Sequence, residues 1–460
     1  MEPPFDIAAD LDTPVSAYLK LRPFQPRFLL ESVEGGERVG RFSFLGFGDV
    51  LEVVLDERGF RIGDELRPRP ADRDQLLEYL RDALARAPRL APEAPGLPFH
   101  GGLVGASAYD IVRFFERLPD HTRVDEVAPD AVWMAPSSVL VFDHLTRRAA
   151  LLHAGSESER QAVRRDVIRA LQGGIPARRR GEFSAPVASI SGDAFCAAVD
   201  RAKENIAAGD VYQLVLSVCF SGDCSLEPFE AYRALRLLNP SPYMYFIEFG
   251  GGAIAGSSPE ALVRLQGRQA ALRPIAGTRP RGTSPEQDRQ REAELLADPK
   301  EAAEHVMLVD LARNDLGRVG VPGTIRVHPS RAVERYSHVM HLVSGVVGEL
   351  EAEYDAMDLF AAAFPAGTLV GAPKVRAMEL IEEYEPIRRG FYAGTIGYFD
   401  VDGGMDQAIA IRTLVFGEGR YRFQAGAGIV ADSIPENEYA EVLAKSAILR
   451  QALEIARDGL

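Results

Sequence analysis

The chain has 460 residues, 46% of them hydrophobic, and a formal net charge of -15 at pH 7. This length and apolar content are enough to bury one large core or two cores of ordinary domain size. The excess of acidic residues opposes the binding of a polyphosphate over any broad surface, so nucleic acid is excluded as an expected partner. A small anionic ligand would need a pocket that supplies its own cations and amides.

Cysteine usage and hydropathy indicate a reducing environment. Cys196, Cys219 and Cys224 show no paired metal spacing and do not predict a disulfide framework. The first residues lack the charged and then apolar pattern of a secretory signal, and no window approaches the roughly 18 apolar residues typical of a transmembrane helix. We therefore expect a cytoplasmic protein with no role at a membrane.

Residues 173–186, GGIPARRRGEFSAP, are rich in Gly, Pro and Arg and predict a linker. The linker separates an N-terminal α+β region, 1–180, from a C-terminal region, 187–460. In the N-terminal region the apolar patterns predict several strands and one helix. The strands are expected over 41–45, 50–55 and 139–142, and the helix over 74–87.

The C-terminal region alternates between helical and extended patterns. Helices are expected over 191–208, 292–313, 356–364, 373–383 and 435–456. Strands are expected over 211–220, 253–256, 395–399 and 408–416. Because strands often follow strands, the order favours an antiparallel sheet over repeated βαβ units, and the fold class is predicted to be α+β.

General catalytic motifs are absent from the sequence. It contains no phosphate-binding G-x-x-x-x-G-K-[ST] loop, no G-x-S-x-G elbow and no H-E-x-x-H pair, and glycines 250–252 and 256 do not have the dinucleotide-binding spacing. The sequence therefore gives no motif support for nucleotide hydrolysis or hydride transfer. His338 and His341 lie three residues apart without a third ligand at metal spacing. We expect a structural or acid–base histidine there, not a zinc site.

Acidic residues on two predicted helices are candidates for a cation site. Glu438, Glu441 and Lys445 share one stripe of the last helix, where two carboxylates can hold a cation. A solvated face with an ordinary Glu441–Lys445 pair is the alternative. Glu304 lies beside an apolar stripe, and a carboxylate there needs a partner, either a magnesium ion or a buried salt bridge.

Three features further along the chain are typical of anion binding. The run 406–415 alternates as a strand and puts Arg412 among small alanines, where it can clamp a carboxylate or pair within the protein. Gly426 and Gly428 allow backbone amides to approach an anion, although a bulge explains them equally well. The glycine loop 365–374 leads into a helix and offers free amides, or it is a simple connection.

Several runs follow one another along nearly the whole chain: LLES (29–32), NPSPYM (239–244), GSSPE (256–260), PIAGTRPRG (274–282), EHVMLVDLARNDLGRV (304–319), HLVS (341–344), FPAGTLVGAPK (364–374), AIRT (410–413) and AGAGIV (425–430). Together they resemble the chorismate-utilising enzymes, and specifically the large subunits, or component I, of anthranilate synthase. The resemblance implies a fold in which large antiparallel sheets form a sandwich with helices outside. The implied activity is the Mg2+-dependent conversion of chorismate and ammonia to anthranilate and pyruvate in tryptophan biosynthesis.

The resemblance also implies roles for individual residues. Glu304 and Glu441 match the magnesium ligands of the family, and Glu260 matches its proposed general acid. His341 and Thr368 match residues that line the reaction centre. The positions that match chorismate contacts are Gly277, Thr278, Tyr392, Arg412, Gly426, Ala427, Gly428 and Lys445.

Two positions discriminate among members of the family. Gln213 stands where isochorismate- and salicylate-forming relatives carry a lysine that activates water. Ala276 stands where aminodeoxychorismate synthases commonly carry a nucleophilic lysine, but some of those enzymes lack it, so component I of that enzyme remains the alternative. A non-catalytic chorismate- or tryptophan-binding regulator would require the loss of a metal ligand or of the acid, and neither is lost.

The family resemblance implies two further interactions. Because the chain has no nucleophilic-cysteine elbow, ammonia is expected to come from a separate glutamine amidotransferase subunit, component II. The LLES and NPSPYM runs resemble a site at which tryptophan binds and inhibits. The residues implicated are Glu31, Ser32, Pro242, Tyr243 and Met244, and ordinary strand packing is the alternative.

Overall fold

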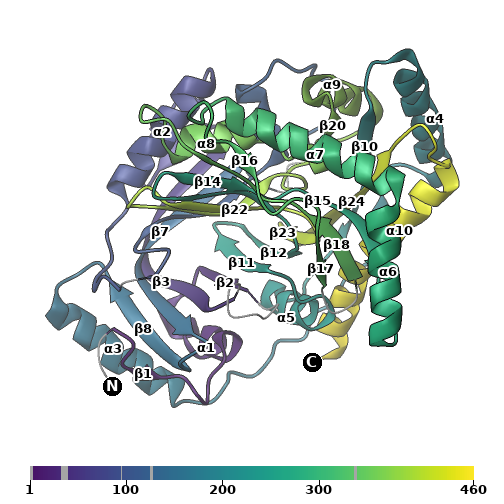
Figure 1. The fold of residues 1–460 in the computed structure, drawn as a ribbon. Coiled ribbons are helices and arrows are strands. Elements are labelled where there is room, and N and C mark those ends of the chain that lie inside the picture. Colours follow the sequence, from purple (N-terminus) through teal and green to yellow (C-terminus); the bar gives the residue numbers. More distant parts are fainter. Residues whose placement is uncertain (1–3, 33–39, 95, 125–127, 336–338) are drawn as a thin grey trace.

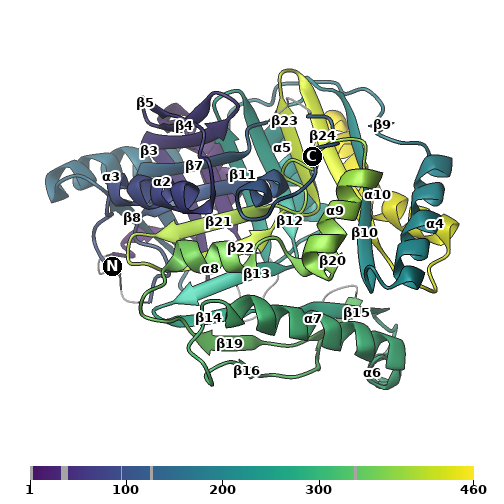
Figure 2. The same ribbon diagram turned by 90° about the horizontal axis from the view of Figure 1, so that it is seen from above.

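The chain folds into extensive antiparallel β-sheet with helices on the outside (Figures 1 and 2). The computed structural model describes residues 4–32, 40–94, 96–124, 128–335 and 339–460. The predicted α+β class is confirmed. The helices are α1 (Pro14–Lys20), α2 (Arg73–Arg86), α3 (Glu157–Leu171), α4 (Gly192–Ala208), α5 (Pro228–Leu238), α6 (Pro285–Ala297), α7 (Pro299–Gly317), α8 (Ala356–Ala363), α9 (Lys374–Tyr384) and α10 (Pro435–Asp458).

The main sheet extends in two branches from β7 (Ala131–Asp143), which pairs with both β3 (Phe42–Asp56) and β6 (Gly102–Ser107). The first branch continues from β6 through β21 (Thr395–Asp400), β22 (Met405–Ile409), β13 (Ala261–Gln266), β14 (Gln269–Leu272), β19 (Val346–Glu349) and β16 (Arg326–Val327). The second continues from β3 through β2 (Phe28–Glu31), β11 (Tyr243–Phe249), β12 (Gly252–Ser258), β23 (Thr413–Gly417), β24 (Arg420–Ile429) and β10 (Gln213–Asp223).

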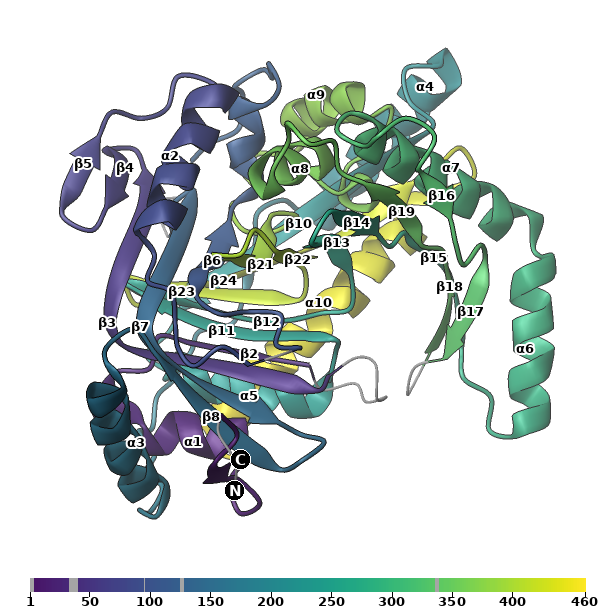
Figure 3. The same ribbon diagram turned by 60° about the vertical axis from the view of Figure 1, so that its left-hand side comes forward.

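Short strands complete the main sheet, and a separate small sheet lies apart from it. The short strands are β1 (Ile7–Ala8), β4 (Gly59–Ile62), β5 (Glu65–Arg67), β8 (Arg148–His153), β9 (Val187–Ala188) and β20 (Gly371–Ala372). The small sheet contains β15 (Ile275–Pro280), β17 (Ala332–Arg335) and β18 (Val339–Val343). Figure 3 shows the small sheet beside α6, on the side of the molecule away from α2 and α3.

The chain crosses from one branch to the other in two places that matter for the site. Pro259 and Glu260 connect β12 of the second branch to β13 of the first, and residues 410–412 connect β22 to β23. Arg412 has a φ of 50°, which turns the backbone at the second crossing. The single strand predicted over 408–416 is therefore wrong, because its two halves pair with different partners.

A second prediction fails for a reason that the sequence contains. The helix predicted over 292–313 is two helices, because Pro299 has no N–H to continue α6. The Asp298 carboxylate caps α7 by accepting from the backbone N–H groups of Lys300 and Glu301. The predicted strands 41–45 and 50–55 are one strand, β3, with an irregularity between Phe47 and Val50.

The other predicted elements are confirmed. The helices predicted over 74–87, 191–208, 356–364, 373–383 and 435–456 correspond to α2, α4, α8, α9 and α10. The predicted strands 139–142, 211–220, 253–256 and 395–399 correspond to β7, β10, β12 and β21. Among the residues that the structure describes, no helix is long and apolar enough to cross a membrane.

The segments before and after the predicted linker build the sheet together. β2 pairs with β11, and β6 pairs with β21, so each branch begins with strands of the first segment and continues with strands of the second. Both large hydrophobic clusters contain side chains from both segments, such as Leu29 with Phe246 in one and Val104 with Ile396 in the other. The division into regions 1–180 and 187–460 stays a prediction.

Candidate active site

A cavity of about 620 Å³ lies where the two branch crossings meet α7, α10 and the 3-10 helix η3 (Gly367–Leu369). It collects residues that are far apart in the sequence. Nearly all of the predicted catalytic, substrate and metal positions line it: Glu260, Gly277, Thr278, Glu304, His341, Thr368, Tyr392, Arg412, Gly426, Gly428, Glu441 and Lys445. The side chain of Ala427 belongs to the hydrophobic core.

Glu260 is the acid–base candidate of the cavity. Its carboxylate oxygen Oε1 accepts a hydrogen bond from Thr368 Oγ1 at 2.9 Å. Burial raises the pKa of Glu260 to about 7, against the lowering effects of the Thr368 hydrogen bond and of the positive charges on Arg412 and Lys445. A carboxyl group with such a pKa holds a proton near neutral pH and can donate it to a leaving group.

His341 lies on β18 opposite the β15 strand that carries Gly277 and Thr278. Its Nδ1 is 3.2 Å from the carbonyl oxygen of Gly277 and 2.9 Å from Thr278 Oγ1. Burial lowers the pKa of His341, and the nearby Arg412 charge lowers it further. The imidazole is therefore neutral at pH 7. Gly277 has a φ of 71°, a conformation that disfavours a side chain and brings the backbone up to the cavity.

Arg412 and the glycines of β24 form the part of the cavity suited to an anion. Arg412 Nη1 donates to Asn239 Oδ1 at 3.3 Å, so the guanidinium is oriented from within the protein. A Cβ atom at Gly426 would lie 2.7 Å from the Tyr392 hydroxyl, and one at Gly428 would lie 2.7 Å from Gln213 Nε2. Close packing against lining side chains requires these glycines. The ladder to β10 runs through both positions without a shift in register, so the bulge alternative fails.

Carboxylates from α7 and α10 form the helical wall of the same cavity. Burial raises the pKa of Glu304, and the neighbouring charges of Glu301 and Glu441 raise it further. A cation between Glu304 and Glu441 would relieve this repulsion, and oxygen ligands of this kind suit magnesium. Glu441 also pairs with Lys445 at 2.6 Å, and Lys445 Nζ donates to the Gly426 carbonyl at 3.0 Å. The donor set therefore fits a divalent cation held next to a bound anion.

Three of the predicted tryptophan-site residues lie on paired strands, Glu31 on β2 and Tyr243 and Met244 on β11, and none of the three lines the cavity. Glu31 pairs with Met244 across the ladder. The Glu31 carboxylate accepts from Arg236 Nε at 3.1 Å and from the Tyr232 hydroxyl, so it is already paired within the protein. The Tyr243 hydroxyl donates to Asp406 Oδ1 at 3.1 Å.

The other two predicted positions, Ser32 and Pro242, flank these strands. Ser32 Oγ is buried and has no hydrogen-bond partner among the described residues. Pro242 lies in the turn between α5 and β11. His338 lies outside the residues that the structure describes.

The cavity also contains lining residues to which the sequence analysis assigned no role. Asn239, Ser241, Gln424, Lys300 and Glu301 all line it. Asn239 and Ser241 belong to the NPSPYM run, and Gln424 directly precedes AGAGIV, so proximity to these runs was an available signal. No sequence signal indicated that Lys300 and Glu301 line the cavity, because their position depends on the break between α6 and α7.

A half-buried protonatable acid, an oriented arginine and a carboxylate pair around one cavity are features of an enzyme that acts on a small anionic substrate. Residues 25–451 match the chorismate binding enzyme family. The chain belongs to this family of chorismate-utilising enzymes, and the relatives it matches over nearly its full length are component 1 proteins of anthranilate synthase.

Relatives and solved structures support this placement. Anthranilate synthase component 1 of Thermus thermophilus is 47% identical over 98% of this chain and 97% of its own length. The component 1 of Pseudomonas putida is 43% identical over 97% of this chain and 94% of its own length. The crystal structure of anthranilate synthase component I from Streptococcus pneumoniae matches with a TM-score of 0.80 and 35% identity, covering 96% of this chain and 99% of that one.

A more distant structure shares the fold. The menaquinone-specific isochorismate synthase of Escherichia coli matches with a TM-score of 0.69 and 21% identity, covering 95% of this chain and 90% of that one. The large antiparallel sheets with helices outside are therefore an architecture that enzymes with other products also use.

Proposed function

We propose that this chain is the chorismate-consuming subunit of anthranilate synthase and forms anthranilate and pyruvate from chorismate and ammonia. The observation that carries the proposal is the convergence of Glu260, Arg412 and the Glu304–Glu441 pair on one cavity. The near full-length similarity to component 1 proteins supports it. The pathway would be that of tryptophan biosynthesis.

Each residue of the cavity has a part in the proposed reaction. Ammonia attacks ring carbon 2 while the hydroxyl at carbon 4 takes a proton from Glu260 and leaves as water. Loss of the proton on carbon 2 then expels pyruvate and restores the aromatic ring. Thr368 orients the acid through its 2.9 Å hydrogen bond, and Arg412 is placed to hold a substrate carboxylate.

Magnesium is the proposed cofactor, with Glu304 and Glu441 as the residues that would hold it. When bound there, the ion would neutralise a carboxylate of the substrate. The raised pKa of Glu304 supports this assignment. Its carboxylate is partly desolvated and lies near the charges of Glu301 and Glu441, so a cation there would stabilise the ionised form.

The choice of nucleophile is supported by the residues that stand at two lining positions. Gln213 and Ala276 both line the cavity, so a lysine at either position would reach the reacting substrate. A glutamine amide is not basic and does not activate water, which favours ammonia over water as the nucleophile. Alanine cannot form a covalent adduct, which favours elimination of pyruvate.

The ammonia would come from a glutamine amidotransferase subunit, as the term component 1 in the names of the relatives implies a second component. Tryptophan is proposed as an inhibitor that binds beside β2 and β11. Since Arg236 and Tyr232 already hold the Glu31 carboxylate, the backbone near Ser32 and the Tyr243–Met244 strand are the groups that remain for such a ligand.

Product analysis tests the proposal against its alternative. Chorismate incubated with the chain, magnesium and an ammonium salt should give equal amounts of anthranilate and pyruvate by mass spectrometry. An amino product that retains the enolpyruvyl group would identify an aminodeoxychorismate synthase. Tight binding of chorismate without any product would identify the non-catalytic regulator.

A further inference from the structure

A fully buried ion pair lies directly behind the cavity. Glu385 follows α9 and Arg389 lies four residues later, and their side chains are 3% and 1% exposed. Arg389 Nε donates to Glu385 Oε2 at 2.9 Å and Nη2 donates to Oε1 at 2.6 Å, a two-pronged contact that fixes the plane of the guanidinium. The pair is thus rigid and shielded from water.

The remaining donors of Arg389 hold two segments of the cavity wall. Nη1 donates to the carbonyl oxygen of Leu369 at 2.7 Å, and Nη2 donates to the carbonyl oxygen of Val215 at 2.9 Å. Leu369 and Val215 both line the cavity. Leu369 also follows Thr368, whose hydroxyl donates to Glu260, so the guanidinium fixes the backbone that presents this hydroxyl.

Glu385 and the Arg389 guanidinium also contact two other parts of the cavity wall. Glu385 Oε1 accepts from the backbone N–H of Ser217 at 2.9 Å and from its hydroxyl at 2.7 Å. Ser217 Oγ in turn accepts from Gln424 Nε2 at 2.8 Å, and Gln424 lines the cavity. The Arg389 guanidinium lies 5.6 Å from the ring centre of Tyr392, another lining residue.

We propose that Glu385 and Arg389 are positioning residues that hold η3, β10, β24 and Tyr392 in the arrangement needed for catalysis. The inference rests on the proposed function of the cavity. A buried ion pair gains little stability over a well-packed apolar pair, because desolvation offsets the attraction. This pair instead makes hydrogen bonds to several separate segments of the cavity wall, and apolar side chains could not make them.

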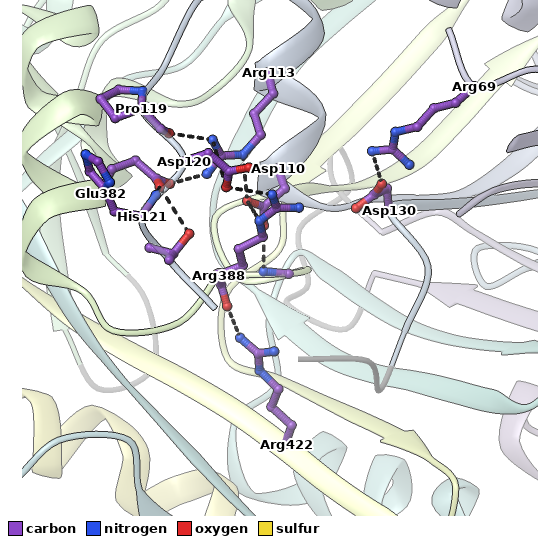
Figure 4. Close-up of polar contacts among 12 residues, drawn as sticks. Arg69, Asp110, Arg113, Pro119, Asp120, His121, Asp130, Glu382, Arg388 and Arg422 are labelled. Atoms are coloured by element: carbon purple, nitrogen blue, oxygen red, sulfur yellow. Dashed lines mark hydrogen bonds and ion pairs between the residues drawn. The ribbon is translucent and has the colours of Figure 1, made fainter. Parts of the chain in front are cut away.

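A buried acid in the last turn of α9, just before Glu385, provides a matched control. Glu382 in α9 is 3% exposed and pairs with Arg113, and its other oxygen accepts from Thr122 Oγ1 at 3.1 Å. Figure 4 shows this network, which links α9 to residues of the N-terminal segment such as Asp110. None of the partners of Glu382 among the described residues lines the cavity. Its link to the Arg389 segment is indirect, through Arg113 and Asp110 to the backbone N–H of Gly390, so a change at Glu382 removes no direct contact to a lining residue.

The test compares Glu385→Gln and Arg389→Lys with Glu382→Gln by steady-state kinetics with chorismate and ammonium salt. Misplacement of Thr368 should lower kcat of Glu385→Gln by about tenfold to a hundredfold, with a smaller change in the chorismate KM. Arg389→Lys keeps the charge but not the fork, so its kcat should be intermediate. Glu382→Gln should lose thermal stability but keep the kcat and KM of the parent.

A double variant separates positioning from stability. Combining Glu385→Gln with Arg389→Met removes both charges of the pair. The melting temperature should therefore be higher than that of Arg389→Met alone, while kcat stays low. Recovery of kcat together with stability, or equal kcat in the Glu385→Gln and Glu382→Gln variants, would overturn the proposal.

Hydrogen exchange tests, independently of turnover, whether the pair holds the backbone of the cavity wall. Amides of residues 367–372 and 391–394 should exchange faster in Glu385→Gln and not in Glu382→Gln. Unchanged exchange at both segments would refute positioning. A parent chain that makes no product would refute the proposed function instead, and the exchange comparison would still test the hold on the backbone.

Discussion

The two walls of the cavity use the same residue type in different environments. At the sheet crossing Glu260 is half-buried, accepts a hydrogen bond from Thr368 and has its pKa raised to about 7 by desolvation. On the helices, the side chain of Glu441 is 47% exposed and pairs with Lys445. These differences in solvent access and neighbouring charge support the proposed roles, a proton donor for Glu260 and a cation ligand for Glu441. The following predictions test this division of roles.

The largest effect is expected on the helical wall. Glu304→Gln removes a ligand of the proposed magnesium ion, so several kcal/mol of charge stabilisation are lost and turnover should fall at least roughly 10³-fold. Magnesium titration by calorimetry should show the loss of the same site in Glu304→Gln and Glu441→Gln. Asp310→Asn, an exposed change on the same helix, serves as the control. Full activity in chelator-treated parent enzyme would contradict the assignment.

The next effect is expected at the sheet crossing. Glu260→Gln keeps the shape of the side chain but removes the proton donor, and kcat should fall by roughly 10² to 10⁴. Magnesium binding should remain as in the parent, because the acid is not one of the proposed ligands. If Glu260→Gln also abolished magnesium binding, the separation between the two walls would be wrong.

Dependence on pH sharpens the role of Glu260. A general acid must be protonated, so at a constant concentration of free ammonia kcat should be level below pH 7 and fall as pH rises through about 7. At constant total ammonium the growing fraction of free ammonia opposes this fall. Thr368→Val removes the hydrogen bond that lowers the pKa of Glu260, so its falling limb should move to higher pH. An unmoved limb would mean that another group titrates.

The smallest effect on turnover is expected away from both walls. Ser32→Arg would put a large side chain at the proposed tryptophan site, leaving ammonia-dependent turnover within a few-fold of the parent but removing inhibition by tryptophan. Binding should be reciprocal, with chorismate and tryptophan weakening each other by the same factor. Calorimetry of the parent is the check. If the parent enzyme does not bind tryptophan, the LLES and NPSPYM runs have only the alternative role, ordinary strand packing.

The sequence predicted long amphipathic elements well and sheet crossings poorly. The helix α10 begins where its pattern predicted and ends two residues later, because its apolar stripe is local information. The break at Arg412 was missed, since the run 406–415 alternates smoothly and only its pairing partners change. The division at Pro299 had a local signal in the proline and was predictable.

Roles that depend on tertiary burial were the least accessible from sequence. Glu385 and Arg389 lie in a run, EYEPIRRG, whose charges resemble those of an exposed turn, and only the packed fold buries them. Glu260 was identified by family resemblance alone, because nothing in its local pattern indicates the burial that raises its pKa. Asn239 and Ser241 lie in a recognised run and still received no role, because only the fold shows that they line the cavity.

The central claim is that the cavity converts chorismate with ammonia, and the fluorescence of anthranilate tests it most directly. The purified chain with chorismate, magnesium and an ammonium salt should develop this fluorescence, and the rate should depend on the metal. With glutamine in place of ammonium the isolated chain should give none until an amidotransferase subunit is added. No fluorescence with ammonium and magnesium, from a folded chain that binds chorismate, would contradict the account.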